Sequence, residues 1–296
     1  MKYDLIIVGA GSAGCALASR LTEDPSKSVL LLEAGPDYIS LANLPPEIAN
    51  GYSQAASSEG SAYNWAYRAT GTPVQSFSMR ADRGKIVGGS GAINGQVFLR
   101  GLPEDYDYWA SQGNCEWSFL KLLPYFRRLE TDTDINDDFH GIDGPVPVRR
   151  FKFDEWQPFQ KAFYEACLES GFPGDEDMNH PDSTGVGPVP FNNINGVRMS
   201  TAVTYLDAAR HRLNLTIRGE ALALRILFEG YRATGVEVES GGQRFSVEGD
   251  EVVLAAGGIA SPQILMLSGI GPGTQLRTLG IPVLMDLPGV GQNLRD

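Results

Sequence analysis

The sequence has few of the residues that build disulfide frameworks and zinc sites. Three of its 296 residues are cysteines and three are histidines. Cys15, Cys115 and Cys167 form neither a CxxC pair nor a Cys/His spacing, which argues against a disulfide framework and a zinc site. We therefore expect no metal site and three buried thiols.

Positive charge is also scarce. The chain has 24 Lys and Arg against 36 Asp and Glu, which gives a formal net charge of -12. Acidic residues gather in "ETDTDINDD", residues 130–138, where we expect a solvated loop. This charge balance disfavours nucleic acid and other polyanions as partners.

Long apolar runs are absent as well. No stretch approaches the ~20 residues of a membrane-spanning helix, so we expect no integral membrane segment. The N-terminal "MKYDLIIVGAG" leads directly from a short apolar run into a glycine turn. It lacks the longer apolar core and cleavage site of a secretory signal peptide. We therefore expect a cytoplasmic protein.

The chain does contain a βαβ pattern at its start. Residues 5–8 and 28–35 have the continuous apolar character of buried parallel strands. Between them, Gly9, Gly11 and Gly14 have the GxGxxG spacing. The first glycine permits a tight turn, the second lets backbone approach a pyrophosphate, and the third lets the helix pack on the strand.

A carboxylate supports the same interpretation. Glu33 lies 19 residues after Gly14, at the end of the second expected strand. A carboxylate there accepts hydrogen bonds from ribose hydroxyls and repels a 2′-phosphate. The pyrophosphate would meet free N–H groups at the helix N-terminus. The pattern therefore predicts a site for an adenine dinucleotide other than NADP.

The chain after Glu33 bears on which dinucleotide is bound. Residues 36–78 lose periodicity and form a long irregular excursion, and a second glycine cluster follows at residues 84–95. Loops of that length are usually functional. A nicotinamide-binding domain usually continues with further βα units, so two glycine-rich segments favour a longer, extended ligand.

The pattern changes again between residues 144 and 199. Short expected strands there flank one amphipathic helix, "PFQKAFYEACLESG", which indicates a second domain inserted into the first. The later chain is expected to form a helix at residues 202–210, several strands up to residue 249, a buried parallel strand at 250–258, and a helix starting near Pro262.

Two longer segments carry a resemblance to a known family. "GKIVGGSGAINGQVFLRGLPEDYD" (residues 84–107) resembles the first signature of the glucose-methanol-choline (GMC) flavoprotein oxidoreductases. "GGIASPQILMLSGIG" (residues 257–271) is similar to the second, with Gly258 where the family usually has alanine. Segments at 113–130, 140–148 and 198–217 are also similar, so the resemblance spans essentially the whole chain.

The resemblance implies an α/β fold. It would be a Rossmann-like FAD-binding domain with a mixed sheet, plus part of an inserted α+β substrate domain. The expected boundaries are 1–143 and 200–296 for the FAD-binding domain and 144–199 for the substrate-domain segment.

The resemblance also implies FAD as the cofactor. The adenosine diphosphate half would be held around the first glycine turn and the end of the second strand, by Gly9, Gly11, Ser12, Ala13, Gly14, Glu33 and Ala34. The flavin would lie along Val87, Gly89, Ser90, Asn94, Gly95 and Val97. Further cofactor contacts would come from Trp65, Ala223, Ala256 and Gly257. Some members bind flavin covalently through a histidine at the position of Ile93, so non-covalent FAD is expected here.

The reaction implied is that of a choline or alcohol dehydrogenase. A base removes the hydroxyl proton of a small-molecule alcohol while hydride passes to flavin N5. The family's base is a histidine beyond the residues present, and none of His140, His180 and His211 matches it. We therefore assign no catalytic residue. The last segment, "PGVGQNLRD", resembles one that the family continues with histidine, so the base is expected in a C-terminal half, which could be a separate chain.

Two alternatives stay open. The same scaffold hosts flavin-containing lyases and a light-driven decarboxylase, and the chain could be a non-catalytic FAD-binding fragment. The identity of the alcohol and the electron acceptor are not assigned.

Overall fold

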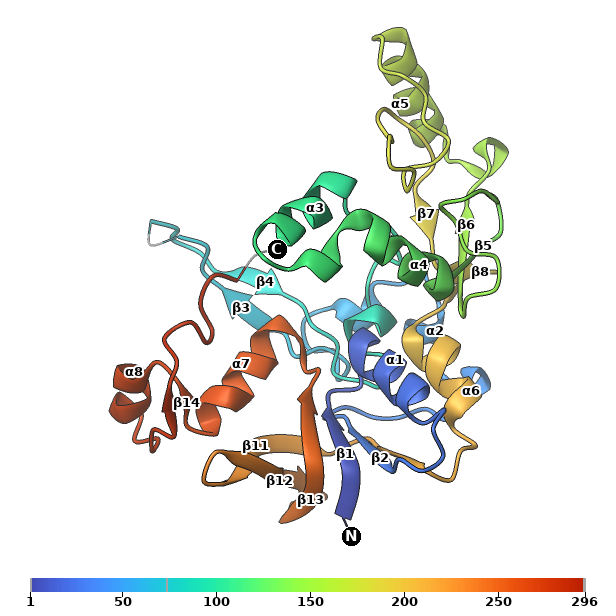
Figure 1. Ribbon diagram of the computed structural model, residues 1–296. Coiled ribbons are helices and arrows are strands. Elements are labelled where there is room, and N and C mark those ends of the chain that lie inside the picture. The colour runs from blue at the N-terminus through green and yellow to red at the C-terminus, as the bar shows by residue number, and fades with distance from the viewer. Residues whose placement is uncertain (1, 73, 295–296) are drawn as a thin grey trace. The chain divides into compact units, whose positions relative to one another are not determined.

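The computed structural model describes residues 2–72 and 74–294, so Arg295 and Asp296 of the terminal segment lie outside the described residues. The chain forms two compact units (Figure 1). The first comprises residues up to Ala49, Ser53–Asn94 and the chain from Ser200 onward. The second comprises Asn50–Tyr52 and Gly95–Met199.

The division between the units differs from the sequence-based boundaries at one end. The second unit ends at Met199, where the inserted domain was expected to end. It begins at Gly95 rather than at residue 144. Residues 95–143 belong to it because they pack on it: β5 (Glu130–Asp132) pairs with β6 (Val146–Arg150), and Asp132 forms an ion pair with Arg150.

The first unit is built on a six-stranded sheet in the order β10-β2-β1-β13-β12-β11 (Figure 1). Strands β10, β2, β1 and β13 run parallel, and β12 and β11 add antiparallel pairs. The sheet is therefore mixed, as predicted. The strand bounds are β1 Lys2–Val8, β2 Val29–Leu32, β10 Leu215–Arg218, β11 Leu222–Glu229, β12 Arg232–Ser240 and β13 Gln243–Leu254.

Strand β1 is buried on both faces of this sheet. Leu5 and Ile7 pack into one apolar cluster, with Cys15 and Ala18 of α1 (Ser12–Leu21). Ile6 and Val8 pack into another on the opposite face, which includes Ile264 of α7 (Gly257–Leu267). Because alternate side chains point to opposite faces, the continuous apolar run has the double coverage of a parallel strand.

Two expectations for the later chain were wrong in detail. Residues 243–254 form one strand rather than two: β13 pairs antiparallel with β12 at its start and parallel with β1 from Glu248 onward. Helix α7 starts at Gly257, so Pro262 lies inside it rather than in its first turn. Pro262 has no N–H to donate to the helix, but the helix continues to Leu267.

The remaining elements of the first unit are short. They are α2 (Pro46–Ala49), the pair β3 (Tyr67–Ala69) and β4 (Met79–Ala81), a π-helical turn at Ala202–Leu206 continued by α6 (Asp207–Ala209), α8 (Gly273–Thr278), and the pair β14 (Ile270–Gly271) and β15 (Met285–Asp286). Residues 36–72 and 74–78 are thus largely irregular, as the sequence indicated.

The second unit has a small sheet in the order β5-β6-β7, with β7 at Pro190–Phe191. Its helices are α3 (Pro103–Ser111), α4 (Phe119–Leu129) and α5 (Pro158–Glu169), and β8 (Asn193–Ile194) pairs with β9 (Val197–Arg198). No residue of α5 is buried, and Phe159 and Phe163 are 82% and 58% exposed. Helix α5 therefore carries an open apolar face.

The cysteines do not all have the expected environment. Cys15 is buried under the first glycine turn, where its thiol donates to Ala10 O at 3.1 Å. Cys167 is half-buried and Cys115 is exposed, so the prediction of three buried thiols was wrong for these two.

Within residues 2–72 and 74–294, the helices are too short or too polar to cross a membrane.

Candidate functional site

The candidate site lies where the parallel strands of the first unit end. Val8 is in register with Leu32 on one side and with Leu254 on the other. These three residues line a cavity of about 720 Å³. Parallel α/β sheets bind their ligands outside the carboxyl ends of the strands, so this cavity has the position of a cofactor site.

The first glycine turn forms one wall of the cavity. Gly9 has a φ of +99°, in the left-handed region that favours glycine. A Cβ on Gly14 would lie 1.9 Å from Gly9 O, so only glycine lets the helix approach the turn this closely. The turn leads directly into α1, whose first residues, Ser12 and Ala13, line the cavity.

The second glycine cluster packs directly against the first. Gly88 N donates to Ala10 O at 2.7 Å. Gly89 has a φ of +56°, and a Cβ there would lie 2.6 Å from Gly11 Cα. The two glycine-rich segments, far apart in the sequence, thus meet backbone to backbone at one cavity.

Glu33 follows β2 and is 7% exposed. Its Oε2 accepts the N–H of Ala10, and its Oε1 accepts that of Gly35, both at 3.0 Å. Burial raises the pKa of Glu33, although hydrogen bonds from Gly35, Ala10 and Ala34 act in the opposite direction. Each carboxylate oxygen has a second lone pair, so Glu33 can also accept a ligand hydroxyl.

An aromatic wall lines another side of the cavity. Trp65 stacks on Tyr67 with ring centroids 5.8 Å apart and an interplanar angle of 4°. Lys85 Nζ lies 4.9 Å from the centroid of the Trp65 ring. Both rings line the cavity, which gives it a flat apolar surface.

Most of the predicted cofactor residues gather at this cavity. Those that line it are Gly9, Gly11, Ser12, Ala13, Glu33, Ala34, Trp65, Gly89, Ser90, Ala223, Ala256 and Gly257. Gly14 packs on the glycine turn, and Val87 is buried in the apolar cluster with Leu206. The side chain of Asn94 is exposed.

Two predicted residues belong to the second unit. Gly95 lines a separate cavity there, of about 890 Å³, and Val97 is 51% exposed and forms a β-bridge with Phe191. Several residues that line the first cavity were not predicted from the sequence, among them Tyr67, Arg83, Leu222, Gln263 and Leu267. The alternation of aromatic residues at Trp65 and Tyr67 could have indicated that Tyr67 lines the site. The other residues lie at loop, strand and helix positions that carry no sequence motif.

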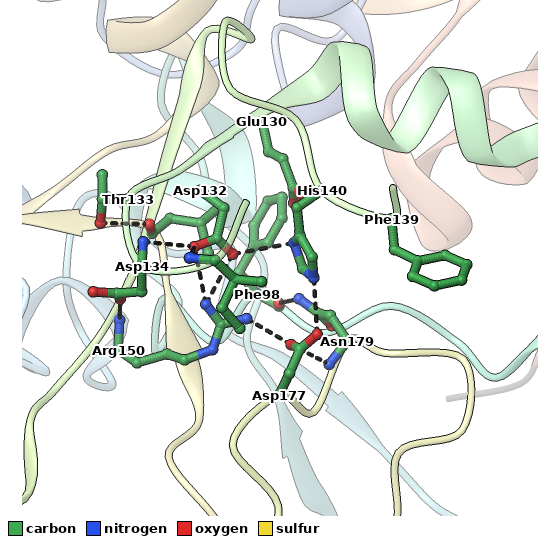
Figure 2. A network of polar contacts seen from close by, with 12 residues as sticks. Phe98, Glu130, Asp132, Thr133, Asp134, Phe139, His140, Arg150, Asp177 and Asn179 are labelled. Carbon is green, nitrogen blue, oxygen red and sulfur yellow. Dashed lines mark hydrogen bonds and ion pairs between the residues drawn. The ribbon is translucent and has the colours of Figure 1, made fainter. Parts of the chain in front are cut away.

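The second unit contains a buried polar network around His140 (Figure 2). His140 is 0% exposed, as is Glu130, and Asp132 is 6% exposed. His140 Nδ1 lies 3.0 Å from Glu130 Oε1 and 3.1 Å from Asp132 Oδ2, and its Nε2 lies 2.9 Å from Asp177 Oδ2. The expectation of a solvated loop at residues 130–138 was therefore wrong for Glu130 and Asp132.

Two arginines complete this network. Arg150 Nη1 donates to Asp132 Oδ2 at 2.8 Å, and its Nη2 donates to Asp177 Oδ1 at 2.7 Å. Arg100 Nη2 donates to Glu130 Oε1 at 2.5 Å. Burial by itself would raise the pKa of Asp132, but hydrogen bonds from His140 and Arg150 hold it well below its usual range.

The network also has donor spacing that a cation could use. Donor atoms of Glu130, Asp132 and His140 lie within 4.8 Å of one another, a grouping that the sequence spacing did not indicate. However, these carboxylates are already paired with Arg100 and Arg150. We therefore interpret the cluster as an ion-pair network.

The fold and the glycine cavity define the class of protein: an α/β protein with a Rossmann-like dinucleotide site. Comparison with known proteins narrows the class to a family. The sequence model of the GMC oxidoreductases matches residues 3–296, so the chain belongs to the GMC oxidoreductase family.

Three similar proteins illustrate this membership. An oxygen-dependent choline dehydrogenase of Burkholderia multivorans is 47% identical over 300 residues, covering 100% of this chain and 52% of the relative. The structure of pyridoxine 4-oxidase from Mesorbium loti has a TM-score of 0.89 at 36% identity, covering 97% of this chain and 55% of that one. An FAD-dependent oxidoreductase from Chaetomium thermophilum has a TM-score of 0.90 at 34% identity, covering 99% and 52%. The chain thus spans about half the length of these relatives.

Proposed function

We propose that this chain binds FAD and forms the FAD-binding part of an oxidoreductase that acts on the CH–OH group of a small-molecule alcohol. The observation that carries the proposal is the meeting of two glycine-rich segments and Glu33 at one cavity. Relatives named as a choline dehydrogenase, a pyridoxine oxidase and an FAD-dependent oxidoreductase support the reaction class.

The residues of the cavity fit FAD. At Gly9 and Gly14 the neighbouring backbone lies too close for a side chain, so only backbone atoms are present there. The N-terminus of α1, at Ser12 and Ala13, suits a pyrophosphate, because its N–H groups are free and the helix dipole favours an anion. Glu33 suits ribose hydroxyls. When bound, FAD would supply a hydride acceptor.

The remaining predicted residues keep their assignments within the proposal. Ala34 would contact the adenosine half, Trp65, Ala223, Ala256 and Gly257 would make further cofactor contacts, and Gly89 and Ser90 would lie along the flavin. Val87, Asn94, Gly95 and Val97 would lie along the flavin. The domain assignment stays a proposal too, with an FAD-binding domain that corresponds to the first unit.

The proposal includes non-covalent binding of FAD. Ile93 stands where some members of the family attach flavin through histidine, and its side chain is 5% exposed in a cluster with Ile48 and Ile86. We expect the purified chain to bind FAD with visible flavin absorbance and to release it on acid precipitation. Yellow flavin that stays with the precipitate would contradict this, and a chain that takes up no FAD would refute the proposed function.

The proposal places the catalytic base outside this chain. The relatives are about twice as long, and the open face of α5, with Phe159 and Phe163, offers a surface for further polypeptide. A C-terminal half, continuous or separate, would supply the base.

A cytoplasmic location is part of the proposal and is supported by the free thiols of Cys115 and Cys167.

A turnover assay tests where the base lies. We expect the 296-residue chain, verified by intact mass and loaded with FAD, to leave the flavin oxidised when alcohols are added anaerobically. Choline and pyridoxine serve as probes. Flavin reduction by the chain alone would show that its own residues suffice. Cleavage of a cyanohydrin without net flavin reduction would favour the lyase alternative.

Substitution of Glu33 tests the ribose contact. Glu33→Gln keeps the size of the side chain but replaces one acceptor oxygen with an NH₂ group, which opposes the N–H of Ala10 or Gly35. Losing the charge-assisted hydrogen bond to a ribose hydroxyl costs about 1.5–3 kcal/mol, which weakens FAD binding about 10- to 100-fold. Flavin fluorescence titration measures the dissociation constant.

A surface glutamate supplies the control for this measurement. Glu23 pairs with Arg20 on the surface at the end of α1, and its side chain is 45% exposed. Glu23→Gln is expected to bind FAD like the unchanged chain. Equal affinity of the Glu33→Gln variant would exclude the assigned contact.

A further inference from the structure

A segment of the second unit, residues 95–100, is held by hydrogen bonds at Gln96, Phe98 and Arg100. Gln96 Nε2 donates to Gly51 O, and Gln96 Oε1 accepts from Asn193 Nδ2, both at 2.5 Å. Phe98 N donates to Pro190 O at 2.9 Å. These contacts hold the segment from one side, at Gln96 and Phe98.

The amide of Asn179 holds the segment from another side. Its Nδ2 donates to Phe98 O, and its Oδ1 accepts from Arg100 N, both at 2.9 Å. The side chain thus forms the pair of bonds that a neighbouring strand would form with this backbone. Asn179 is 4% exposed, so water does not substitute readily for these bonds.

Asn179 is in turn fixed by the network around His140 (Figure 2). Asn179 N donates to Asp177 Oδ1 at 3.0 Å, and Asp177 Oδ2 contacts His140 Nε2 at 2.9 Å. The far end of the segment enters the same network directly, because Arg100 pairs with Glu130 and donates to Phe139 O at 2.9 Å.

The charges of the network balance only when His140 is an imidazolium. Three carboxylates, on Glu130, Asp132 and Asp177, face two guanidinium groups, on Arg100 and Arg150. The exposed carboxylate of Asp137 and the exposed guanidinium of Arg127, which bind the backbone of His140, add one charge of each sign. A neutral His140 would leave one negative charge in a dry site without compensation, which is costly. Both ring nitrogens of an imidazolium donate, and both face carboxylates here.

We propose that His140 and its carboxylate partners form a charge-balanced clamp that fixes residues 95–100 through Asn179 and Arg100. Its members are positioning residues for the FAD site. This rests on the proposed function, in which Gly95 and Val97 of the segment lie along the flavin. The clamp itself is a property of the second unit alone.

The pKa values agree with this geometry. Burial by itself would lower the pKa of His140, but hydrogen bonds to Asp132, Asp177 and Glu130 outweigh it and raise the pKa to about 11. His140 N also donates to Asp137 Oδ1, and Arg127 Nε donates to His140 O.

The sign of the pH dependence follows from these shifts. A raised pKa on His140 gives stability that is complete below its ordinary value of 6.5 and is lost as the pH rises towards about 11. Lowered pKa values on Asp132 and Asp177 give stability that is present above 3.8 and lost as the pH falls below it. The clamp is therefore charged and intact throughout the neutral range.

The test compares three variants of the full chain: Asn179→Ala, His140→Gln, and the control His211→Gln, whose side chain is exposed in the first unit. Amide hydrogen exchange of Arg100 is measured first, without FAD. Loss of the hydrogen bond from Arg100 N to Asn179 Oδ1 is expected to speed exchange of the Arg100 amide roughly tenfold in Asn179→Ala and His140→Gln. No change is expected in His211→Gln. Unchanged exchange in Asn179→Ala would overturn the clamp, even if His140→Gln failed to fold.

The FAD-loaded proteins then test positioning. The dissociation constant for FAD, the visible circular dichroism of the bound flavin and its reduction potential are expected to change in Asn179→Ala and His140→Gln and not in His211→Gln. In the unchanged chain they should stay constant between about pH 5 and 9. Faster exchange with unaltered flavin properties would overturn the positioning role. Failure of the unchanged chain to bind FAD would refute the proposed function, and Arg100 exchange would still decide the clamp.

Discussion

Replacing Gly14 with alanine is expected to abolish FAD binding. The added Cβ would lie 1.9 Å from Gly9 O and 3.1 Å from Gly9 C. Both are backbone atoms that cannot rotate away, so α1 or the turn must shift. Overpacking of this kind costs about 1–3 kcal/mol, and a shift of the turn that costs about 3 kcal/mol of binding free energy lowers the affinity for FAD more than about 100-fold. Flavin fluorescence titration of the purified variant measures it.

Gly258 provides a matched control for this substitution. It lies in the first turn of α7, lines the same cavity, and has 3.5 Å between an added Cβ and the nearest atom, Leu294 Cδ1. Gly258→Ala is therefore expected to retain FAD and to gain about 0.5–1 kcal/mol of helix stability. If both variants bound FAD alike, the close packing at Gly14 would not be needed for the site.

Replacing Arg150 with methionine is expected to give the largest loss of stability in the second unit. Arg150 is 4% exposed and pairs with both Asp132 and Asp177. Methionine fills much of the volume but leaves two carboxylates without their guanidinium partner. Removing one partner of a buried ion pair costs about 3–5 kcal/mol.

Urea unfolding followed by tryptophan fluorescence is suited to this variant. Trp109, Trp117 and Trp156 belong to the second unit, and Trp65 is the only tryptophan of the first. The control is Arg149→Met, since Arg149 is more exposed and, among the residues that the structure describes, forms one ion pair, with Glu155 at 3.2 Å. That variant should lose no more than about 1 kcal/mol. Equal losses in the two variants would show that burial of the network adds nothing.

The sequence predicted those parts of the fold that local pattern determines. The apolar run of β1, the glycine spacing after it and Glu33 at the end of β2 each follow from neighbouring residues. The residues that line the glycine-rich cavity, the proposed cofactor site, could therefore be predicted in outline from the sequence. The first residues of α1 line it because the glycine turn dictates where that helix starts.

What the sequence did not predict depends on partners far along the chain. The sequence-based boundary between two strands was placed after residue 249, but Gly249 lies inside β13, where a Cβ would meet the side chain of Ile6 at 2.8 Å. Glu130 and Asp132 were predicted to be solvated because runs of acidic residues usually are. Their burial depends on Arg100 and Arg150, which are distant in sequence and carry no motif.

The pairing of β1 with β13 has a consequence for how the chain folds. Strand β1 is made first during synthesis, but one of its two neighbours ends only at Leu254. The second unit, which ends at Met199, can close earlier. Such long-range pairing is slow because the intervening loop must be ordered first. The glycine-lined cavity, which Val8 and Leu254 line together, can therefore be completed only after the chain up to Leu254 has been made.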